Sequence, residues 1–503
     1  MKKRIIIPIV AIGLSVCITF TALATAYIDK WKILVGDDDV VVSESDANKQ
    51  QIDDTKSMLD FIKSDVKPQA NTDPQAALAF DGKESTYWTA PSAGSATLQL
   101  DFDEMTVVNQ IHLKEICEKE GGNSRSYRLD AWNGEEWVKI YNSDIIENYK
   151  LCAFDKIKTW AIRLVIEEGT ETPISIAEMT AVNQPAVQKD EDFHVMAYIH
   201  HNAFGVGGNF KIEEEKLNVL TDVIFHGFAT WRLDSNNKLY LSLNENIDDY
   251  IMQLKNAIGD KDVNIYFGIA NGTDLVSDQA QLDTVAQQTL DFIVKYNLAG
   301  VEIDYEYPYS TAAHNAYNQF ILTIGNLLHQ NNKKLATAIG MWNNRFGDEQ
   351  LAMIDYLNIM NYDSSSYYNH YHSTFKFAVD ELNKAADRNY PTYKINLGVP
   401  FYGIRYNNPQ GFSLNDAKNY SNFYDPEFDD PISETGFDIG ANTLFGYYFN
   451  GVQMLRDKTA YAAASGCGGI MIWQLTGDSS YKGQASLIRA IGEAKEEYTY
   501  CNK

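Results

Sequence analysis

Short apolar runs alternate with helical segments throughout the second half of the chain. After residue 193 there are eight such runs, and stretches with apolar residues at helical spacing, such as residues 281–297, lie between them. Repeated strand–helix units of this kind predict a parallel (β/α)8 barrel over residues 193–503. The eight expected strands lie within residues 194–200, 221–231, 263–272, 300–308, 333–342, 355–363, 394–403 and 468–478.

The first half of the chain has a different pattern. Residues 56–185 contain short runs of alternating apolar and polar residues, including ATLQLDF, VVNQIHL, SYRLDAW, EWVKIY and WAIRLVI, separated by Gly, Asn and Asp. This pattern is typical of an antiparallel β-sandwich. Residues 186–192 form a polar linker between the two halves, and residues 27–55 form an acidic lead-in or tether. The fold class is therefore a multidomain chain with a β-sandwich followed by a (β/α)8 barrel.

The first 26 residues have the pattern of an export signal. Lys2, Lys3 and Arg4 precede a nearly apolar stretch over residues 5–23, and two small-x-small cleavage sites follow at 22–24 and 24–26. This pattern predicts a secreted, extracellular protein. The alternative is an uncleaved segment that anchors the protein to the cell surface, which is the one circumstance in which the membrane would be a partner.

Charge and cysteine content exclude several classes of function. Forty-two basic and 68 acidic side chains give a net charge of −26, and so acidic a surface repels nucleic acid and anionic lipid. Cys117, Cys152, Cys467 and Cys501 remain after the leader; they are too few for a disulfide scaffold and lack metal-ligand spacing. A Cys117–Cys152 pair and the oligomeric state stay open.

The stretch GVEIDYEYP, residues 300–308, places carboxylates at every second position of an apolar run. Glu302, Asp304 and Glu306 would share one face of a strand, with neighbours roughly 7 Å apart. Pro308 ends the strand. In a barrel this row leads along the interior to the C-terminal mouth, where active sites form. The alternative is an edge strand with a solvated acidic face.

Such close carboxylates cannot all ionise, so at least one is expected to stay protonated near neutral pH. Glu306 is the outermost and is best placed to give its proton to a bound leaving group. Neighbouring carboxyl groups with separated pKa values are typical of glycoside hydrolysis.

These residues carry a resemblance to a known family. AGVEIDYEYP resembles the fourth-strand signature of family 18 glycoside hydrolases, the chitinases and endo-β-N-acetylglucosaminidases, usually written Asp-Gly-x-Asp-x-Asp-x-Glu. MNYD (360–363), LGVPFYG (397–403) and GGIMIWQLTGD (468–478) resemble the motifs of the sixth, seventh and eighth strands. The resemblance covers most of residues 193–497 and implies a β-linked N-acetylglucosamine substrate.

The resemblance also implies roles for individual residues. Glu306 would protonate the glycosidic oxygen, while Asp304 would orient the acetamido group of the substrate and stabilise an oxazolinium intermediate. Tyr362, helped by Asp363, would hydrogen-bond the acetamido oxygen, and Trp473 would stack under the sugar. The family uses the N-acetyl oxygen of the substrate as nucleophile, without a cofactor, and retains the anomeric configuration. Glu302, Met360 and Tyr402 are further substrate-binding positions.

Some positions depart from the family pattern or have two interpretations. Ala299 and Glu302 replace the first two Asp residues of the signature, and YFGIANG replaces the usual Ser-x-Gly-Gly of the third strand. The longer Glu302 could crowd Asp304. Trp231, Trp342 and Tyr402 follow expected strands, where they either line a sugar cleft or pack in the core.

The N-terminal half resembles the discoidin, or coagulation-factor type C, family. AFDGKESTYWTA (79–90) and the later stretch ISIAEM carry this resemblance. It implies a galactose-binding-like sandwich that serves as a carbohydrate-binding module. Asp81, Thr86 and Glu178 correspond to a structural Ca²⁺ site of that family. The alternative is a turn that is stabilised by its own side chains.

The sequence therefore predicts a secreted, retaining, chitinase-like hydrolase that cleaves β-1,4 bonds next to N-acetylglucosamine. Two alternatives remain. One is an endo-β-N-acetylglucosaminidase acting on N-glycan cores, and the other is a catalytically weak chitin- or glycan-binding lectin on the same barrel. Chitin, an N-glycan and a peptidoglycan-derived sugar all remain candidate substrates.

Overall fold

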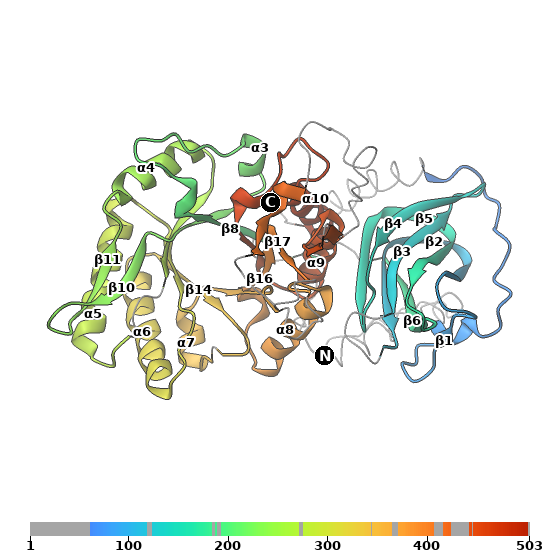
Figure 1. Ribbon diagram of the computed structural model, residues 1–503, viewed down its shortest axis with the longest axis horizontal. Coiled ribbons are helices and arrows are strands. Elements are labelled where there is room, and N and C mark those ends of the chain that lie inside the picture. Colours follow the sequence, from blue (N-terminus) through green and yellow to red (C-terminus); the bar gives the residue numbers. More distant parts are fainter. Residues whose placement is uncertain are drawn as a thin grey trace, which may run out of the picture. The chain divides into compact units, whose positions relative to one another are not determined.

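The computed structural model describes most of the two predicted folded regions (Figure 1). The expected leader, the tether and nearly all of the linker lie outside the described residues. So does the central part of the long connection before the last expected barrel strand, residues 424–441. The described residues are 61–117, 123–183, 187–188, 193–270, 275–343, 345–364, 371–406, 416–423, 442–444 and 446–500.

The N-terminal region contains an antiparallel sheet, as predicted. Its strand order is β1-β6-β2-β5-β3-β4, and the short 3-10 helix η1 (Ala76–Ala79) lies against β6. The core includes the fully buried Trp88, Tyr127 and Leu164. The strands are β1 (Trp88–Thr89), β2 (Ala96–Glu115), β3 (Ser124–Trp132), β4 (Trp137–Ser143), β5 (Lys150–Gly169) and β6 (Ser175–Val182).

Two strands of this sheet are longer than the sequence pattern suggested. The runs ATLQLDF and VVNQIHL, which we expected as separate strands, are the two halves of β2. Their register against β5 shifts between Asp101 and Thr106, because an irregularity rather than a turn separates them. Cys117 donates a hydrogen bond to Asn148 and Cys152 is buried, and the two do not form a disulfide.

Eight parallel strands close into the predicted barrel. Their order is β8-β9-β12-β13-β14-β15-β16-β21, and β21 pairs with β8 to close the ring. Every predicted strand is confirmed, because parallel strands covered by helices read as apolar runs. The strands are β8 (His194–His200), β9 (Asp222–His226), β12 (Asn264–Ala270), β13 (Gly300–Asp304), β14 (Lys334–Ile339), β15 (Tyr356–Ile359), β16 (Ile395–Pro400) and β21 (Gly469–Trp473).

Helices cover the outside of this barrel (Figure 1). Side-chain caps begin three of them: Asp278, Ser310 and Thr374 accept backbone N–H groups at the starts of α5, α6 and α8. No helix among the described residues is long and apolar enough to cross a bilayer. The helices are α3 (Glu214–Leu217), α4 (Ile247–Ile258), α5 (Gln279–Lys295), α6 (Thr311–Gln330), α7 (Asp348–Met353), α8 (Phe375–Asp387), α9 (Val452–Ala464) and α10 (Leu487–Tyr498).

Several shorter strands lie outside the ring of eight parallel strands. A hairpin follows β9, and a short antiparallel sheet in the order β18-β17-β20-β19 follows β16. A further pair, β7 and β22, joins the linker to the C-terminal end of the described chain. These strands are β7 (Val187–Gln188), β10 (Ala229–Leu233), β11 (Leu239–Leu243), β17 (Tyr402–Arg405), β18 (Lys418–Asn419), β19 (Thr443–Leu444), β20 (Tyr447–Tyr448) and β22 (Thr499–Tyr500).

Residues of the sandwich and of α9 meet around a buried ion pair, within one compact unit of the chain. Lys150 Nζ lies 2.9 Å from Asp457 Oδ2, and both side chains are fully buried. Asp457 also accepts hydrogen bonds from Tyr141 Oη (2.8 Å) and the Ala153 backbone N–H (2.9 Å). A polar linker alone gives no sign of this interface.

We predict that Asp457→Asn lowers the free energy of unfolding by about 3–5 kcal/mol, because it leaves the Lys150 ammonium buried without its counter-charge. The matched control is Asp155→Asn. Asp155 of β5 pairs at 2.7 Å with Arg456, which precedes Asp457 on α9. The Asp155 side chain is 81% exposed, so losing this pair should lower the free energy of unfolding by only about 0–1 kcal/mol. Chemical denaturation of both variants measures the two values, and equal losses would contradict the importance of the buried pair.

Candidate active site

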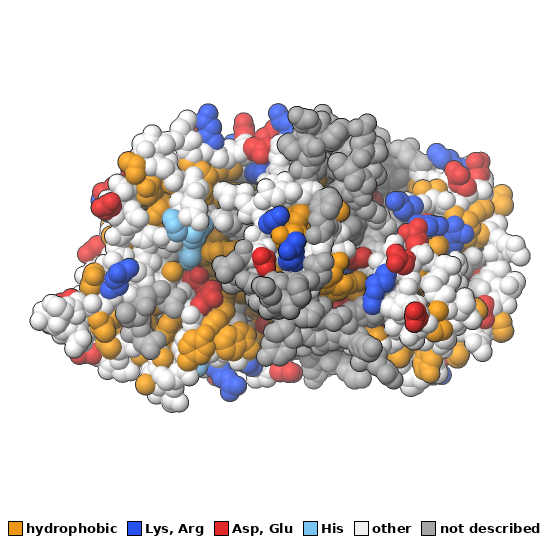
Figure 2. Space-filling model, viewed as in Figure 1, with side chains coloured by type: hydrophobic (Ala, Val, Ile, Leu, Met, Phe, Trp, Pro, Cys, Tyr) orange, Lys and Arg blue, Asp and Glu red, His pale blue; other side chains and the backbone are white. Residues whose placement is uncertain are grey.

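Strand β13 delivers the row of carboxylates to the mouth of the barrel. Val301 and Ile303 are fully buried on the side that packs on the helices, while Glu302 and Asp304 alternate with them on the interior side. Glu306 lies just beyond the strand end and is exposed to solvent. Acidic and histidine side chains gather on this face beside a hydrophobic patch (Figure 2). The predicted inward row is therefore confirmed, and the solvated edge-strand alternative is wrong.

Glu302 is the deepest of the three and is fully buried. Its Oε1 accepts a hydrogen bond from Tyr198 Oη at 2.6 Å. Burial first, and then the charge of Asp304, raise the pKa of Glu302 well above its usual range. Its partners across the sheet, Gly268 and Ala336, are small and leave room for a side chain one methylene longer than Asp. The ionisation of Glu302 is therefore shifted toward the protonated, neutral form.

Asp304 is buried above Glu302 and has a neighbour that sequence reasoning missed. His226, at the end of β9, places its Nε2 3.1 Å from Asp304 Oδ2. The signal was present in the sequence. His226 and Ile224 are alternate residues of β9, so their side chains lie on the same face of the strand. Ile224 belongs to the apolar cluster inside the barrel, and His226 therefore also points inward.

Glu306 has the titration expected of a catalytic acid. It opens to solvent at the mouth, yet surrounding groups remove much of the hydration of its carboxyl group. This desolvation, together with the negative charges of Asp304 and Asp363, raises the pKa of Glu306 to about 8. Glu306 therefore holds its proton at neutral pH and can donate it.

The MNYD motif lies at the end of β15 and faces the same space. Met360, Tyr362 and Trp473 pack against the apolar cluster inside the barrel. Asp363, in a left-handed backbone conformation with φ of 61°, accepts a hydrogen bond from Tyr402 Oη at 2.6 Å. This bond fixes the turn that presents Tyr362. The structure thus brings together the residues that the resemblance implied.

Trp473 forms the aromatic floor of the site. Its ring centroid lies 4.9 Å from that of Tyr198 and 5.4 Å from that of His226. Trp473 ends β21 and is half-buried, so one part of the ring packs while another part can contact a ligand.

The two other tryptophans differ in their surroundings. Trp342 is 57% exposed beside Tyr307, at a centroid distance of 4.6 Å, and near Tyr309, which is 77% exposed. These three residues form an aromatic patch near Glu306, as a sugar-stacking role requires. Trp231 is 0% exposed and packs on Tyr305 and Phe320. The prediction that Trp231 binds substrate is therefore wrong, and the core alternative holds.

A buried lysine supports the MNYD turn and was also missed. Lys458 Nζ donates to Asn361 Oδ1 (3.2 Å), Ser373 Oγ (2.8 Å) and Asn450 Oδ1 (2.8 Å). Asn361 directly precedes Tyr362, so Lys458 ties α9 to the turn that carries the tyrosine. Burial lowers the pKa of Lys458 well below its usual range. No sequence pattern shows that the lysine of this helix is buried.

The three expected calcium-site residues of the sandwich also come together. Thr86 Oγ1 lies 2.9 Å from both carboxylate oxygens of Asp81. Burial and the charge of Asp81 raise the pKa of Glu178 to about 7. This set of oxygen atoms fits a hard cation, although no cluster of three or more Asp, Glu, His or Cys side chains suited to a metal occurs within the described ranges.

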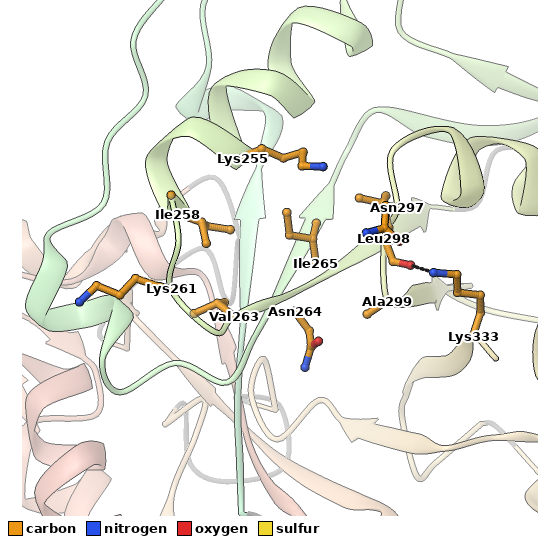
Figure 3. A pocket seen from close by; sticks show the side chains of 11 residues that line it. Lys255, Ile258, Lys261, Val263, Asn264, Ile265, Asn297, Leu298, Ala299 and Lys333 are labelled. Carbon is orange, nitrogen blue, oxygen red and sulfur yellow. Dashed lines mark hydrogen bonds between the residues drawn. The ribbon is translucent and has the colours of Figure 1, made fainter.

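A separate cavity of about 360 Å³ lies around the starts of β12 and β13, at the end of the barrel opposite the mouth (Figure 3). Two of its lysines already donate to backbone carbonyls: Lys255 to Tyr296 (3.0 Å) and Lys333 to Leu298 (2.7 Å). Tyr296 is the C-cap residue of α5, and Leu298 lies between α5 and β13, so both ammonium groups bind backbone carbonyls at this end of the barrel.

The chain matches known proteins in both regions. Residues 194–478 match the model of glycosyl hydrolases family 18, and residues 61–179 match that of the F5/8 type C domain. A probable chitinase 2 of Drosophila melanogaster is 22% identical over 270 residues, covering 42% of this chain and 54% of that protein. Chitinase A1 of Niallia circulans is 26% identical over 269 residues, covering 41% of this chain and 38% of that protein.

The chain thus spans about half or less of the length of these two relatives. Among solved structures, a chitinase from Bacteroides thetaiotaomicron has a TM-score of 0.51 at 21% identity, covering 61% of this chain and 97% of that one. That likeness supports the fold. Because the family model spans more than half of the chain and includes the carboxylate row at the mouth, the chain belongs to glycosyl hydrolases family 18, with an F5/8 type C domain before the barrel.

Proposed function

We propose that this protein is a retaining, chitinase-like glycosidase that cleaves β-1,4 bonds next to N-acetylglucosamine, with Glu306 as general acid and base. The observation that carries the proposal is the pair of carboxyl groups, Glu306 and Asp304, at the mouth of the barrel. A solvent-accessible carboxyl group whose pKa is raised to about 8 lies just beyond a buried aspartate, Asp304, on the same strand. The relatives named as chitinases support a chitin-like substrate.

The proposed first step forms a ring within the substrate. The acetamido oxygen attacks C1 while Glu306 gives its proton to the glycosidic oxygen, and the C1–O bond breaks. Asp304 stabilises the positive charge that develops on the acetamido nitrogen, and Tyr362 orients the group. In the second step Glu306, now a carboxylate, takes a proton from water as the water oxygen attacks C1 and reopens the ring. The two inversions leave the configuration unchanged.

Two further parts of the proposal concern the rest of the chain. The N-terminal pattern supports export, and the acidic composition suits an extracellular polysaccharide hydrolase rather than a nucleic-acid enzyme. The convergence of Asp81, Thr86 and Glu178 supports a structural Ca²⁺ in the sandwich. A sugar-binding role for that domain rests on its family alone.

We predict that Glu306→Gln loses about 10²-fold or more of kcat on an unactivated chitooligosaccharide, because the amide fills the same space but has no acidic proton. The matched variant is Glu302→Gln, the same substitution at a fully buried carboxyl group below the mouth; its loss should be clearly smaller. Initial rates of both variants check this. Retention of more than about a tenth of the wild-type rate in Glu306→Gln would contradict the assignment of the acid.

The pH dependence of kcat/KM follows from the same group. Glu306 must be protonated to act as acid, so activity should persist through neutral pH and fall as the pH rises through about 8. Asp363→Asn removes one of the charges that raise this pKa, so its alkaline limb should move to lower pH. A pH–rate profile of both proteins checks the direction. An alkaline limb near the ordinary pKa of a glutamate would contradict the account.

For the sandwich, we predict that Ca²⁺ raises the melting temperature of the full chain and that Asp81→Ala abolishes this increase. A ligand that binds only the folded form stabilises it by mass action. Thermal melts with added Ca²⁺ and with chelator provide the comparison. Identical melts of the wild-type protein in the two conditions would dismiss the metal.

A further inference from the structure

A buried histidine faces the catalytic carboxylates and has no role in the mechanism described above. His226 Nε2 lies 3.1 Å from Asp304 Oδ2, and the two residues are only 4% and 7% exposed. Both ring nitrogens of His226, and Oδ1 of Asp304, are buried polar atoms for which no hydrogen-bond partner occurs among the described residues. Buried polar atoms of this kind are costly unless they pair with each other or with a ligand.

The charge balance around Asp304 gives this contact its importance. Burial shifts Glu302 below toward its neutral form, and Glu306 above must keep its proton until the leaving group takes it. Among the side chains that the structure describes, His226 alone is recorded at ion-pair distance from Asp304. His226 is therefore the side chain placed to donate an N–H group to the carboxylate that, in the proposed mechanism, faces the oxazolinium ion.

The surroundings of His226 hold its ring in place. The rings of Tyr198 and Trp473 contact it edge-on, at centroid distances of 5.2 and 5.4 Å. Gly268 borders the histidine on a third side. A Cβ atom at this position would lie only 3.0 Å from both Cα and Cδ2 of His226, so a larger residue would crowd the ring. The glycine in YFGIANG is thus what makes room for the histidine inside the barrel.

We propose that His226 is a positioning residue that donates a hydrogen bond from Nε2 to Asp304 Oδ2 and holds the Asp304 side chain in the orientation that the acetamido group requires. This inference rests on the proposed function and assigns it a residue that acts through Asp304. A slight rotation of either side chain aligns the donor, since the two atoms are already at hydrogen-bond distance.

The test compares three substitutions in the full chain, assayed on N-acetylglucosamine oligomers. His226→Phe keeps the aromatic packing but removes the donor. Gln at position 226 can place its amide nitrogen near the former Nε2, so His226→Gln should restore the bond without the imidazole. The control is His194→Phe, at the opposite end of the barrel, which removes a similar pair with Nδ1 2.6 Å from Asp222 Oδ2.

We expect His226→Phe to lower kcat about 10- to 100-fold, less than removal of a donor that touches the transition state directly. KM should change by less than about threefold, because the bond acts mainly in the transition state. His226→Gln should recover most of the loss. His194→Phe should lower the melting temperature but leave kcat within about threefold of wild type.

The possible outcomes distinguish a failure of the proposed function from a failure of the role assigned to His226. A wild-type protein that does not hydrolyse the oligomers overturns the proposed function, and the role of His226 with it. An active wild type whose His226→Phe variant keeps its kcat, or whose His226→Gln variant loses as much as His226→Phe, overturns the role of His226 alone. If His226→Phe fails to fold, His226→Asn replaces it. That shorter amide cannot reach Asp304, so an Asn variant as active as the Gln variant also overturns the inference.

Discussion

The repulsion among the carboxylates on β13 is the constraint around which the barrel is arranged. Glu302 and Asp304 are buried on the same face of one strand, and Glu306 follows at its end. Three charges at this spacing in a closed interior would be prohibitively unstable, so protons and donors are distributed among them. Tyr198 holds Glu302 from below, and burial together with neighbouring charge keeps a proton on Glu306. The same repulsion that makes the row costly supplies the protonated carboxyl group that the proposed hydrolysis requires.

The supporting structure extends well beyond the mouth of the barrel. Adjacent residues of α9 face in two directions: Asp457 binds Lys150 and Tyr141 of the sandwich, and Lys458 binds Asn361 beside Tyr362. One helix therefore contacts both the N-terminal domain and the turn that presents Tyr362.

Much of this organisation is readable from the sequence, and the exceptions have physical causes. The eight strands and the inward face of β13 follow from periodicity, because a strand buried on both sides is apolar and its alternate residues share a face. Trp231 was misassigned, since a tryptophan at a strand end has the same pattern whether it points to the cleft or to the helices. His226 was overlooked although it shares the inward face of β9 with Ile224, whereas the buried position of Lys458 depends on contacts between distant segments, which one sequence does not reveal. The irregularity within β2 was mistaken for a turn for the same reason.

The central claim is that the acetamido oxygen of the substrate, and no side chain of the protein, attacks C1 beside Glu306. Proton NMR during the first turnovers of an N-acetylglucosamine oligomer reads the configuration of the new reducing end directly, before mutarotation. The account predicts that the β-anomer appears first and that a fully deacetylated oligomer, which has no carbonyl oxygen to attack, is not cleaved. An α-anomer appearing first, or equal cleavage of the deacetylated oligomer, would contradict substrate assistance and would assign the attack on C1 to Asp304, Glu302 or water.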